Sequence, residues 1–408
     1  MKKDWEIKKL GEVLVKTETV DPTKHPEIEF AYLDVSSVNK ETKEIETPMV
    51  LLGKEAPSRA KKLVKTGDVI FATVRPTHSR VALVPEEFNE QICSTGYFVL
   101  RTNETIVNKL IFYFLLTDSF NKKIEKMQRG ANYPAVTDND IKGIGIPFPK
   151  SLTEQHRIVS LLDKCFIAID KAKANAEQNL RNAKELFESY FQAVFEKKDC
   201  GWEEKKLGEL ATFRNGMNFT KSSKGEKIKI VGVKDFQDNF WIPSDELDTV
   251  AIDGKLSKID ELEKDDLVAV RSNGNPALIG RTLLAGKVEE KTSHSGFTIR
   301  IRLSSNEVLP IYLCRYLKTQ KTRKQLVETG IGVGIKSLNQ GSLCSLSIPF
   351  PKSLKEQQVI VRQLDVLRAE TQKLEGVYQK KIASLEELKK SVLQKAFSGE
   401  LTEKGGVV

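Results

Sequence analysis

The chain has 408 residues, of which 39% are hydrophobic and 30% charged, and its net charge is +9. This composition excludes a disordered chain, and the length allows two or three domains. The sequence has no run of about 18 apolar residues, the length that a membrane-spanning helix needs. Its start, MKKDWEIKKL, lacks the apolar stretch of a secretory signal, and five widely spaced cysteines favour reduced thiols. We therefore expect a soluble, cytoplasmic, multidomain protein.

The chain contains a tandem repeat. The segment IPFPKSLTEQHRIVSLLD, residues 146–163, recurs 202 positions later, without a gap, as IPFPKSLKEQQVIVRQLD. WEIKKLGEV begins at Trp5 and WEEKKLGEL at Trp202, and FESYFQAVF, residues 187–195, resembles the segment that ends at Phe397. Repeats of this kind define the architecture of a chain. The sequence therefore predicts two similar halves of about 200 residues each.

Within each half, the interior diverges while its ends stay similar. Residues 14–145, the first block, and 211–347, the second block, share only short landmarks, such as TGYFVL at Thr95 and SGFTIR at Ser295. Both blocks contain short β-rich runs bounded by Gly, Pro, Asn and Asp, and one helix each is expected over 109–127 and 310–327. A constant frame with a variable interior indicates one scaffold that carries two different recognition blocks.

A long helix is predicted after each block. Pairs of prolines precede it, and Ser151 with Glu154, like Ser353 with Glu356, has the spacing of a capping box. Each helix would have about 44 residues and a length of roughly 66 Å. Apolar or small residues recur three or four positions apart in both helices, as in a coiled coil. They are Ile158, Leu162, Cys165, Ile169, Ala172, Ala176, Leu180, Ala183, Phe187, Tyr190 and Val194, then Ile360, Leu364, Leu367, Thr371, Leu374, Tyr378, Ile382, Leu385, Val392 and Ala396.

These patterns predict an α+β fold. We expect the two helices to pair with each other, antiparallel, and the alternative is that each helix docks on its own block. The predicted fold has two globular α/β domains in tandem repeat, separated by two long antiparallel coiled-coil-like helices with pseudo-two-fold symmetry. The predicted boundaries are 1–150 for the first domain, 151–199 for the first helix, 200–352 for the second domain, 353–400 for the second helix and 401–408 for a C-terminal tail.

The sequence contains no recognisable catalytic or metal-binding motif. None of the four histidines lies three to five positions from another histidine or a cysteine, the spacing of a zinc site. GIGVGIKS, residues 330–337, has Ile335 where a phosphate-binding loop requires glycine before its lysine. We therefore predict that the chain alone catalyses no reaction and holds no metal ion.

The whole chain resembles the specificity subunit of type I restriction–modification systems. The resemblance rests on the two WE-x-K-K-L-G-E starts, the two IPFPKSL-x-EQ segments and the end SVLQKAFSGEL, residues 391–401. It implies that each domain is a target recognition domain for one half of a bipartite, asymmetric DNA site. It also implies two methyltransferase subunits and two restriction subunits as partners. S-adenosylmethionine would then be bound by the methyltransferase partner, and ATP and Mg by the restriction partner, with no cofactor on this chain.

Candidate DNA contacts lie in polar loops that follow the β-rich runs. Arginine is suited to guanine and asparagine to adenine, and each wrong base pair costs about 1–3 kcal/mol, so three or four read pairs per half would discriminate well. The candidates of the first block are Arg75, Thr77, His78, Ser79, Arg80, Arg129, Asn132 and Tyr133. Those of the second block are Arg214, Asn215, Asn218, Arg271, Ser272, Asn273, Asn275 and Lys336.

Two other classes of protein stay open at this stage. A coiled-coil scaffold without a nucleic-acid role would show no salt-dependent binding to duplex DNA, whereas phosphate contacts release counterions. A stand-alone nuclease without a recognisable motif would cleave DNA in the presence of a metal ion. The basic net charge and the arginine and asparagine content of the loops argue against the scaffold.

Overall fold

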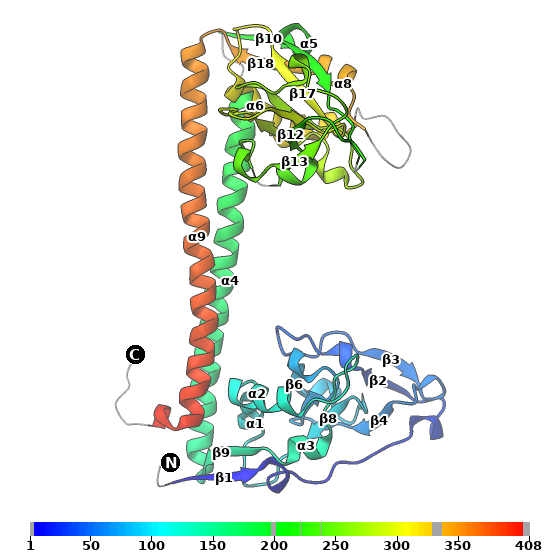
Figure 1. Cartoon of the computed structure of the whole chain (residues 1–408). Helices are drawn as coiled ribbons and strands as arrows, with labels where there is room; N and C mark the ends of the chain where they lie inside the picture. Colours follow the sequence, from blue (N-terminus) through cyan, green and yellow to red (C-terminus); the bar gives the residue numbers. More distant parts are fainter. Residues whose placement is uncertain (1–3, 197–200, 221, 238, 329–336, 403–408) are drawn as a thin grey trace. The chain divides into compact units, whose positions relative to one another are not determined.

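The computed structural model describes residues 4–196, 201–220, 222–237, 239–328 and 337–402 (Figure 1). The chain forms two compact units: unit 1 comprises residues 1–178 and 379–408, and unit 2 comprises residues 179–378. Each unit therefore contains one block together with parts of both long helices. Among the described residues, no helix is long and apolar enough to cross a membrane.

The described residues of unit 1 form three small sheets and three short α-helices besides the ends of the long helices. A four-stranded sheet has the order β3-β2-β7-β4, in which only β2 and β7 are parallel, and a three-stranded antiparallel sheet has the order β6-β5-β8. A separate antiparallel pair joins β1 to β9. The bounds are β1 Trp5–Lys9, β2 Glu29–Leu33, β3 Met49–Leu52, β4 Ala60–Leu63, β5 Val69–Ala72, β6 Val81–Leu83, β7 Ile92–Ser94, β8 Tyr97–Leu100, β9 Gly145–Pro149, α1 Asn108–Leu115, α2 Asp118–Met127 and α3 Asp138–Lys142.

Unit 2 repeats this plan with different numbers of strands: β15, β14 and β17 correspond to β6, β5 and β8, with β11 added, and β13, β12 and β16 correspond to β3, β2 and β7. Its four-stranded sheet has the order β11-β17-β14-β15, its three-stranded sheet β13-β12-β16, and β10 pairs with β18. The bounds are β10 Trp202–Lys206, β11 Ala211–Asn215, β12 Lys227–Val231, β13 Asp248–Ala251, β14 Leu267–Val270, β15 Thr282–Leu284, β16 Thr292–His294, β17 Thr298–Leu303, β18 Ser347–Pro351, α5 Leu207–Leu210, α6 Pro310–Leu317, α7 Gln320–Glu328 and α8 Gln340–Cys344.

The single helix predicted in each block is wrong, because each is two helices. In unit 1 the break lies at Thr117, whose hydroxyl oxygen accepts a hydrogen bond from the Phe120 amide at 3.2 Å and starts α2. In unit 2 the hydroxyl of Thr319 accepts from the amide of Thr322 at the same place in the repeat. A threonine at this position satisfies amides at the start of a helix and so favours a new helix over a continuous one.

The repeated proline segments form strands as well as preceding the long helices. In β9, Pro147 lies opposite Ile7 and Pro149 opposite Trp5, and in β18 the equivalent Pro351 lies opposite Trp202. Proline is tolerated here because a two-stranded ladder leaves one edge of each strand free of partners. The two repeated starts, WEIKK and WEEKK, therefore pair with the two repeated segments that lead into the helices.

The long helices are α4 (Leu152–Glu196) and α9 (Leu354–Ser398), and each starts with the predicted serine cap. The Ser151 hydroxyl accepts from the Glu154 amide, and the Ser353 hydroxyl from the Glu356 amide, at 3.4 Å in both cases. Ala172, Leu180 and Val194 are half-buried, and most other predicted seam residues of α4 are buried, but Tyr190 is exposed. Among the predicted seam residues of α9, Leu374 is exposed.

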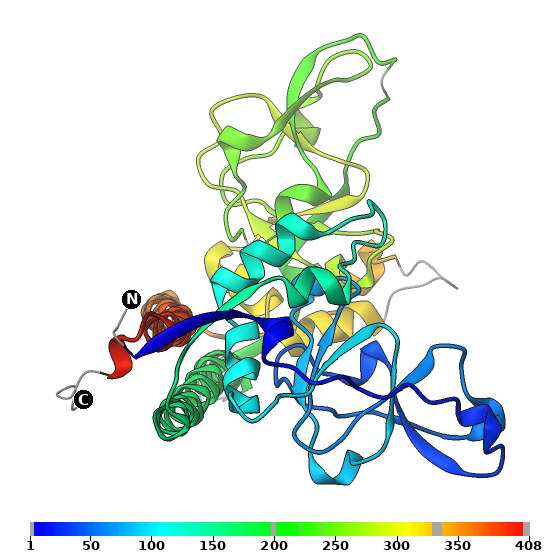
Figure 2. The ribbon, with the colours of Figure 1, turned by 90° about the horizontal axis from the view of Figure 1, so that it is seen from below.

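The two helices run antiparallel, as predicted, within each unit. In unit 1 the start of α4 lies beside the end of α9 (Figures 1 and 2), where Lys173 pairs with Glu386 at 2.7 Å and Lys389 with Asp170 at 2.7 Å. In unit 2 the start of α9 meets the end of α4, and the guanidinium of Arg368 lies 5.0 Å from the centre of the Phe187 ring. The helices also dock on the blocks, so the two arrangements considered from the sequence coexist.

Each block is anchored to the ends of both helices. In unit 1, Leu393 and Ala396 of α9 join the core formed by the first block and the start of α4, and the Phe397 ring contacts Phe114 at 5.5 Å. In unit 2, Phe195 of α4 contacts Tyr316 of α6 at 5.5 Å. These two pairs occupy equivalent repeat positions, so the same aromatic contact holds each block on its helix pair.

Candidate nucleic-acid interface

A buried glutamine locks each block to the start of its long helix. The Gln155 side chain is buried; its amide nitrogen donates to the carbonyls of Thr105 and Pro149 at 3.0 and 2.9 Å, and its oxygen accepts from the Val107 amide at 2.8 Å. Gln357 makes the same three hydrogen bonds in unit 2, to Glu307, Pro351 and Leu309. Buried polar groups with all partners in place fix one geometry, so each block is held rigidly on the scaffold.

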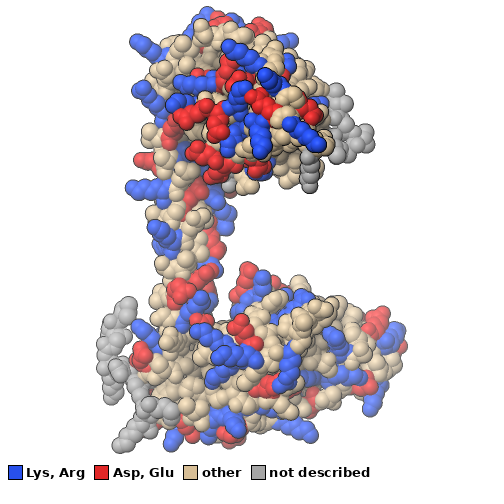
Figure 3. All heavy atoms as spheres, in the orientation of Figure 1, with Lys and Arg blue, Asp and Glu red and all other residues tan. Residues whose placement is uncertain are grey.

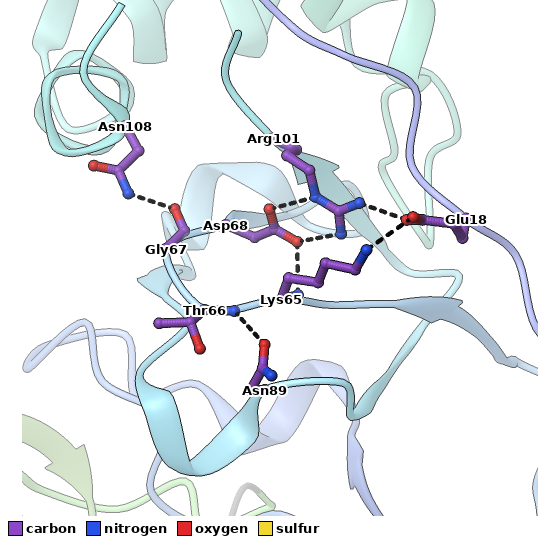
Figure 4. Close-up of polar contacts among 8 residues, drawn as sticks. All are labelled: Glu18, Lys65, Thr66, Gly67, Asp68, Asn89, Arg101 and Asn108. Carbon is purple, nitrogen blue, oxygen red and sulfur yellow. Dashed lines mark hydrogen bonds and ion pairs between the residues drawn. The ribbon is translucent and has the colours of Figure 1, made fainter. Parts of the chain in front are cut away.

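Each block also contains a buried ion pair between two strands of the sheet that carries its candidate loop. Figure 4 shows Asp68, just before β5, receiving two hydrogen bonds from the Arg101 guanidinium at 2.9 and 2.8 Å and a third from the Lys65 amide at 2.8 Å. The Asp68 side chain is only 2% exposed. Asp266 and Arg302 form the equivalent pair in unit 2, with two bonds of 2.7 Å.

The partly exposed Glu18 joins the same network in unit 1 (Figure 4). Hydrogen bonds from Arg101 and Lys65 lower the pKa of the Glu18 carboxyl to about 2. Because these charges are satisfied within the block, they support the strands that carry the loops and are poorly suited to contact DNA.

The candidate residues of the first block come together on two adjoining loops. The Arg75 amide donates to the Pro134 carbonyl at 2.7 Å, and the Val136 amide donates to the Thr73 carbonyl at 3.0 Å. Val74 also forms an isolated β-bridge with Ala135. The structure therefore places the 73–80 loop and the 129–135 loop, which lie about 50 positions apart in the sequence, against each other.

The 73–80 loop has an unusual and well-anchored backbone. Arg75 and Ser79 both have φ of +48°, in the left-handed region that non-glycine residues rarely adopt. The buried Pro76 lies between them, at the start of a single 3₁₀ turn, Pro76–His78. Lys43 donates to the Ser79 carbonyl at 2.7 Å, and the Ser79 hydroxyl donates to the Asn121 side chain at 3.2 Å. This turn leaves Thr77 and His78 exposed to solvent.

The five candidate arginines fall into two groups. Arg129 makes two hydrogen bonds to Asp140 at 3.0 and 3.2 Å, Arg214 pairs with Asp260, and Arg80 donates to the Val38 carbonyl. In the part of the chain that the structure describes, neither the Arg75 nor the Arg271 guanidinium makes a hydrogen bond or an ion pair. These last two are the better placed for a base.

The candidates of the second block converge on the turn 295–297. The Arg271 amide donates to the Phe297 carbonyl at 2.8 Å, and the Gly296 amide donates to the Met217 carbonyl at 2.8 Å. The turn therefore joins the 271–275 loop to residues 214–218, which include Arg214, Asn215 and Asn218. Ser272 forms a β-bridge with Ser337, as Val74 does with Ala135, but Lys336 lies outside the described residues.

The backbone hydrogen bonds also correct which loop residues of the two blocks occupy equivalent positions. Both β-rich runs end on an arginine, so an alignment of the two block sequences pairs Arg75 with Arg271. In the structure, however, the Thr73 amide donates to the Gly96 carbonyl, and the matching hydrogen bond in unit 2 runs from the Arg271 amide to the Phe297 carbonyl. Arg271 thus occupies the place of Thr73, and Asn273 occupies that of Arg75. The Asn273 side-chain oxygen accepts from the Asn275 amide at 2.8 Å, and the Asn275 oxygen from the Ala277 amide at 3.0 Å, so both asparagines shape their turn.

Two residues near the loops were not identified from the sequence. Phe297 is 61% exposed beside Arg271, and it occupies the place of Gly96 in the first block, which has no side chain there. Lys43 lies beside Ser79, and burial together with the charges of Lys389 and Arg80 lowers its pKa to about 8. The lysine lies more than 30 positions before its neighbour in the sequence, so only the fold could reveal it.

Charge alone does not mark a DNA-binding face in the view of Figure 3, where basic and acidic side chains are interspersed over both units. Within the described ranges, no group of three or more His, Cys, Asp and Glu side chains could hold a metal ion. Burial lowers the pKa of His294 to about 3, which keeps it neutral beside the Thr298 hydroxyl at 2.9 Å. That histidine is a packing residue of β16.

Two tandem blocks of one fold, each with adjoining polar loops on a rigid helical support, define a two-site recognition protein. The family model described as "Type I restriction modification DNA specificity domain" matches the chain twice, over residues 2–179 and 200–386. The chain belongs to this family.

Relatives and solved structures cover nearly the same extent. The chain is 28% identical over 373 residues to the StySPI specificity subunit of Salmonella potsdam, which covers 87% of this chain and 79% of that protein. It is 24% identical to the EcoKI specificity subunit of Escherichia coli (strain K12), with the same coverage. The HsdS subunit of Thermoanaerobacter tengcongensis matches at 28% identity with a TM-score of 0.68 over 97% of both chains. A chain from a structural study of complex assembly and conformational transition in a type I R-M system matches with a TM-score of 0.83 and 28% identity, over 97% of this chain and 98% of that one.

Proposed function

We infer that this chain is the specificity subunit of a type I restriction–modification system. It recognises a bipartite, asymmetric DNA target and directs the methyltransferase and restriction subunits to it, without being an enzyme itself. The observation that carries this inference is the double match to a DNA specificity domain, combined with loops whose residues differ between the two blocks. Two different readers on one support suit a target with two different halves.

We propose that base contacts come from the two loop clusters. In the first, Arg75 and Asn132 would contact bases, with Thr77, His78 and Ser79 near phosphates. In the second, Arg271 and Asn218 would have the first role, with Ser272 near a phosphate. Arg129 and Arg214 would reach DNA only by exchanging a carboxylate for a phosphate, which costs little for the exposed Arg129 and more for the half-buried pair of Arg214 with Asp260. Arg80, Tyr133, Asn215, Asn273, Asn275 and Lys336 complete the proposed contact set.

We further propose the composition of the complex. Two methyltransferase subunits and two restriction subunits would assemble with one copy of this chain. S-adenosylmethionine would bind the former, ATP and Mg the latter, and this chain would bind no cofactor. The domain limits 1–150 and 200–352, and a cytoplasmic location, belong to the same proposal.

The test is a base-resolution map of adenine methylation in cells that express this chain with its methyltransferase partner. The expected result is a new motif of two specific halves with a constant gap, which disappears when this chain is omitted. A motif with only one specific half would mean that one block does not read DNA. If both proteins are folded and bound to each other and no motif appears, the inference is wrong.

A further inference from the structure

We propose that Arg75 reads a guanine in the half-site recognised by the first block, and that Tyr133 is the positioning residue that orients the Arg75 guanidinium for this contact. The inference rests on the proposed function and goes further, because it assigns one base to one side chain.

The backbone fixes where the Arg75 side chain starts. An arginine at φ +48° is uncommon, and such conformations persist where the surrounding structure holds them, often at binding sites. Here the Arg75 amide is bonded to the Pro134 carbonyl at 2.7 Å, and the next residue, Pro76, is buried. Tyr133 immediately precedes Pro134, so one hydrogen bond ties the backbones that carry both side chains.

The side chains meet in an open position. The central carbon of the Arg75 guanidinium lies 5.5 Å from the centre of the Tyr133 ring, and Tyr133 is 72% exposed. An exposed aromatic ring contributes no core packing, so its contact with the cation is the interaction that the structure provides for it. The cation lies over the ring, a contact that uses none of the guanidinium N–H groups as hydrogen-bond donors to an acceptor atom.

The available N–H groups favour a base over a phosphate. Arg129 already uses its guanidinium on Asp140, whereas within the described residues that of Arg75 has no acceptor. Guanine offers two acceptors, O6 and N7, that match the planar fork of arginine, and this pairing is the most common specific contact to DNA. A phosphate contact needs only a positive charge and would not require a ring to set the plane of the cation.

The second block carries a different residue at the same place. Asn273 occupies the position of Arg75, and its side-chain oxygen is engaged by the Asn275 amide. The two blocks therefore differ in chemistry at one matched loop position, as two readers of different half-sites would.

The experiment uses the full chain bound to its methyltransferase partner, with Arg75→Lys, Tyr133→Ala and Tyr133→Phe. Tyr190→Ala, which removes an exposed tyrosine of α4, is the matched control. Methylation rates are measured on duplexes that carry the wild-type motif or single substitutions at each position. The half-site of the first block is identified as the half that changes when residues 14–145 are exchanged.

For Arg75→Lys we expect discrimination to fall about 5- to 150-fold at one guanine of that half-site, with the other half-site unchanged. Tyr133→Ala should weaken discrimination at the same guanine, and Tyr133→Phe should retain it because phenylalanine keeps the aromatic face. Unchanged discrimination at the other positions of the first block's half-site reports that unit 1 of each variant still folds.

Three results would overturn the inference. A uniform loss of affinity on all duplexes with Arg75→Lys would identify a phosphate contact. Equal discrimination with Tyr133→Ala and wild type would remove the positioning role. A half-site without guanine would exclude the assignment, whereas the absence of any bipartite motif with the wild-type chain would instead refute the proposed function.

Discussion

Replacing Asp68 with alanine should destabilise unit 1 while leaving unit 2 unchanged. The substitution removes both bonds to Arg101 and the bond to the Lys65 amide. Losing one partner of a buried ion pair costs about 3–5 kcal/mol because the other charge stays buried and unpaired. Since Arg101 keeps Glu18 as a partner, we expect the lower end, about 3 kcal/mol, or roughly a 100-fold change in the unfolding equilibrium.

The assay is amide hydrogen exchange on the full chain, which resolves the two units. Protection of β5 and β8 should fall about 100-fold, while β14 and β17 of unit 2 serve as an internal reference. Glu18→Gln removes an exposed partner and should change protection by less than about 1 kcal/mol. Asp266→Ala should instead lower the amide protection of β14 and β17 in unit 2. A change of less than fivefold in β5 and β8 with Asp68→Ala, or an equal loss in both units, would refute the assignment of this pair as the main polar support of the block.

Three further predictions concern the anchor, the lysine beside the loop and the blocks. Gln155→Leu leaves three buried backbone groups without a partner, so the free energy of unfolding of unit 1 in urea should fall by about 2–4 kcal/mol. Gln357→Leu should have the same effect on unit 2. Losses under about 0.5 kcal/mol would show that these glutamines do not anchor the blocks. The pKa of Lys43 is about 8 in the folded chain and 10.5 as its ordinary value. Between these two values the unfolded chain binds more protons than the folded chain, so the free energy of unfolding should rise with pH relative to that of Lys43→Met. If the free energies of the two proteins changed with pH in parallel, this prediction would be contradicted. Exchanging residues 14–145 for the block of another family member should change one half of the methylated motif, and a change in both halves would show that the blocks do not act separately.

The repeat and the pattern of the long helices were predictable because both are expressed in consecutive residues. The serine caps at Ser151 and Ser353 follow from residue spacing, and the antiparallel pairing follows from the long matching apolar patterns of the two repeated helices. The β9 and β18 strands were not predicted, since their prolines suggested only that a helix could not yet begin. The break at Thr117 escaped prediction because a cap within an amphipathic stretch looks like any other polar position of a helix.

The candidate site was predictable as loops and not as side chains. The sequence indicates that RPTHSR and RGANYP are polar loops, and the structure places them together. It could not indicate that Arg129 pairs with Asp140, that Arg80 donates to the Val38 carbonyl, or that the Arg75 guanidinium has no acceptor among the residues that the structure describes. These relations depend on which distant segments meet. The matched position of Asn273 depends on strand register, which two runs that both end in arginine conceal. Whether the sixteen candidates touch DNA stays a prediction.

The composition of unit 1 has a consequence for the order in which the protein matures during synthesis. Leu393 and Ala396, near the end of the chain, belong to the core that holds the first block, whereas unit 2 is continuous over residues 179–378. On the ribosome, unit 1 therefore cannot complete its core until the end of α9 emerges. Unit 2 has all its segments available once residue 378 has emerged. A premature stop before α9 is complete would thus leave the N-terminal block without its full core, far in sequence from the lesion.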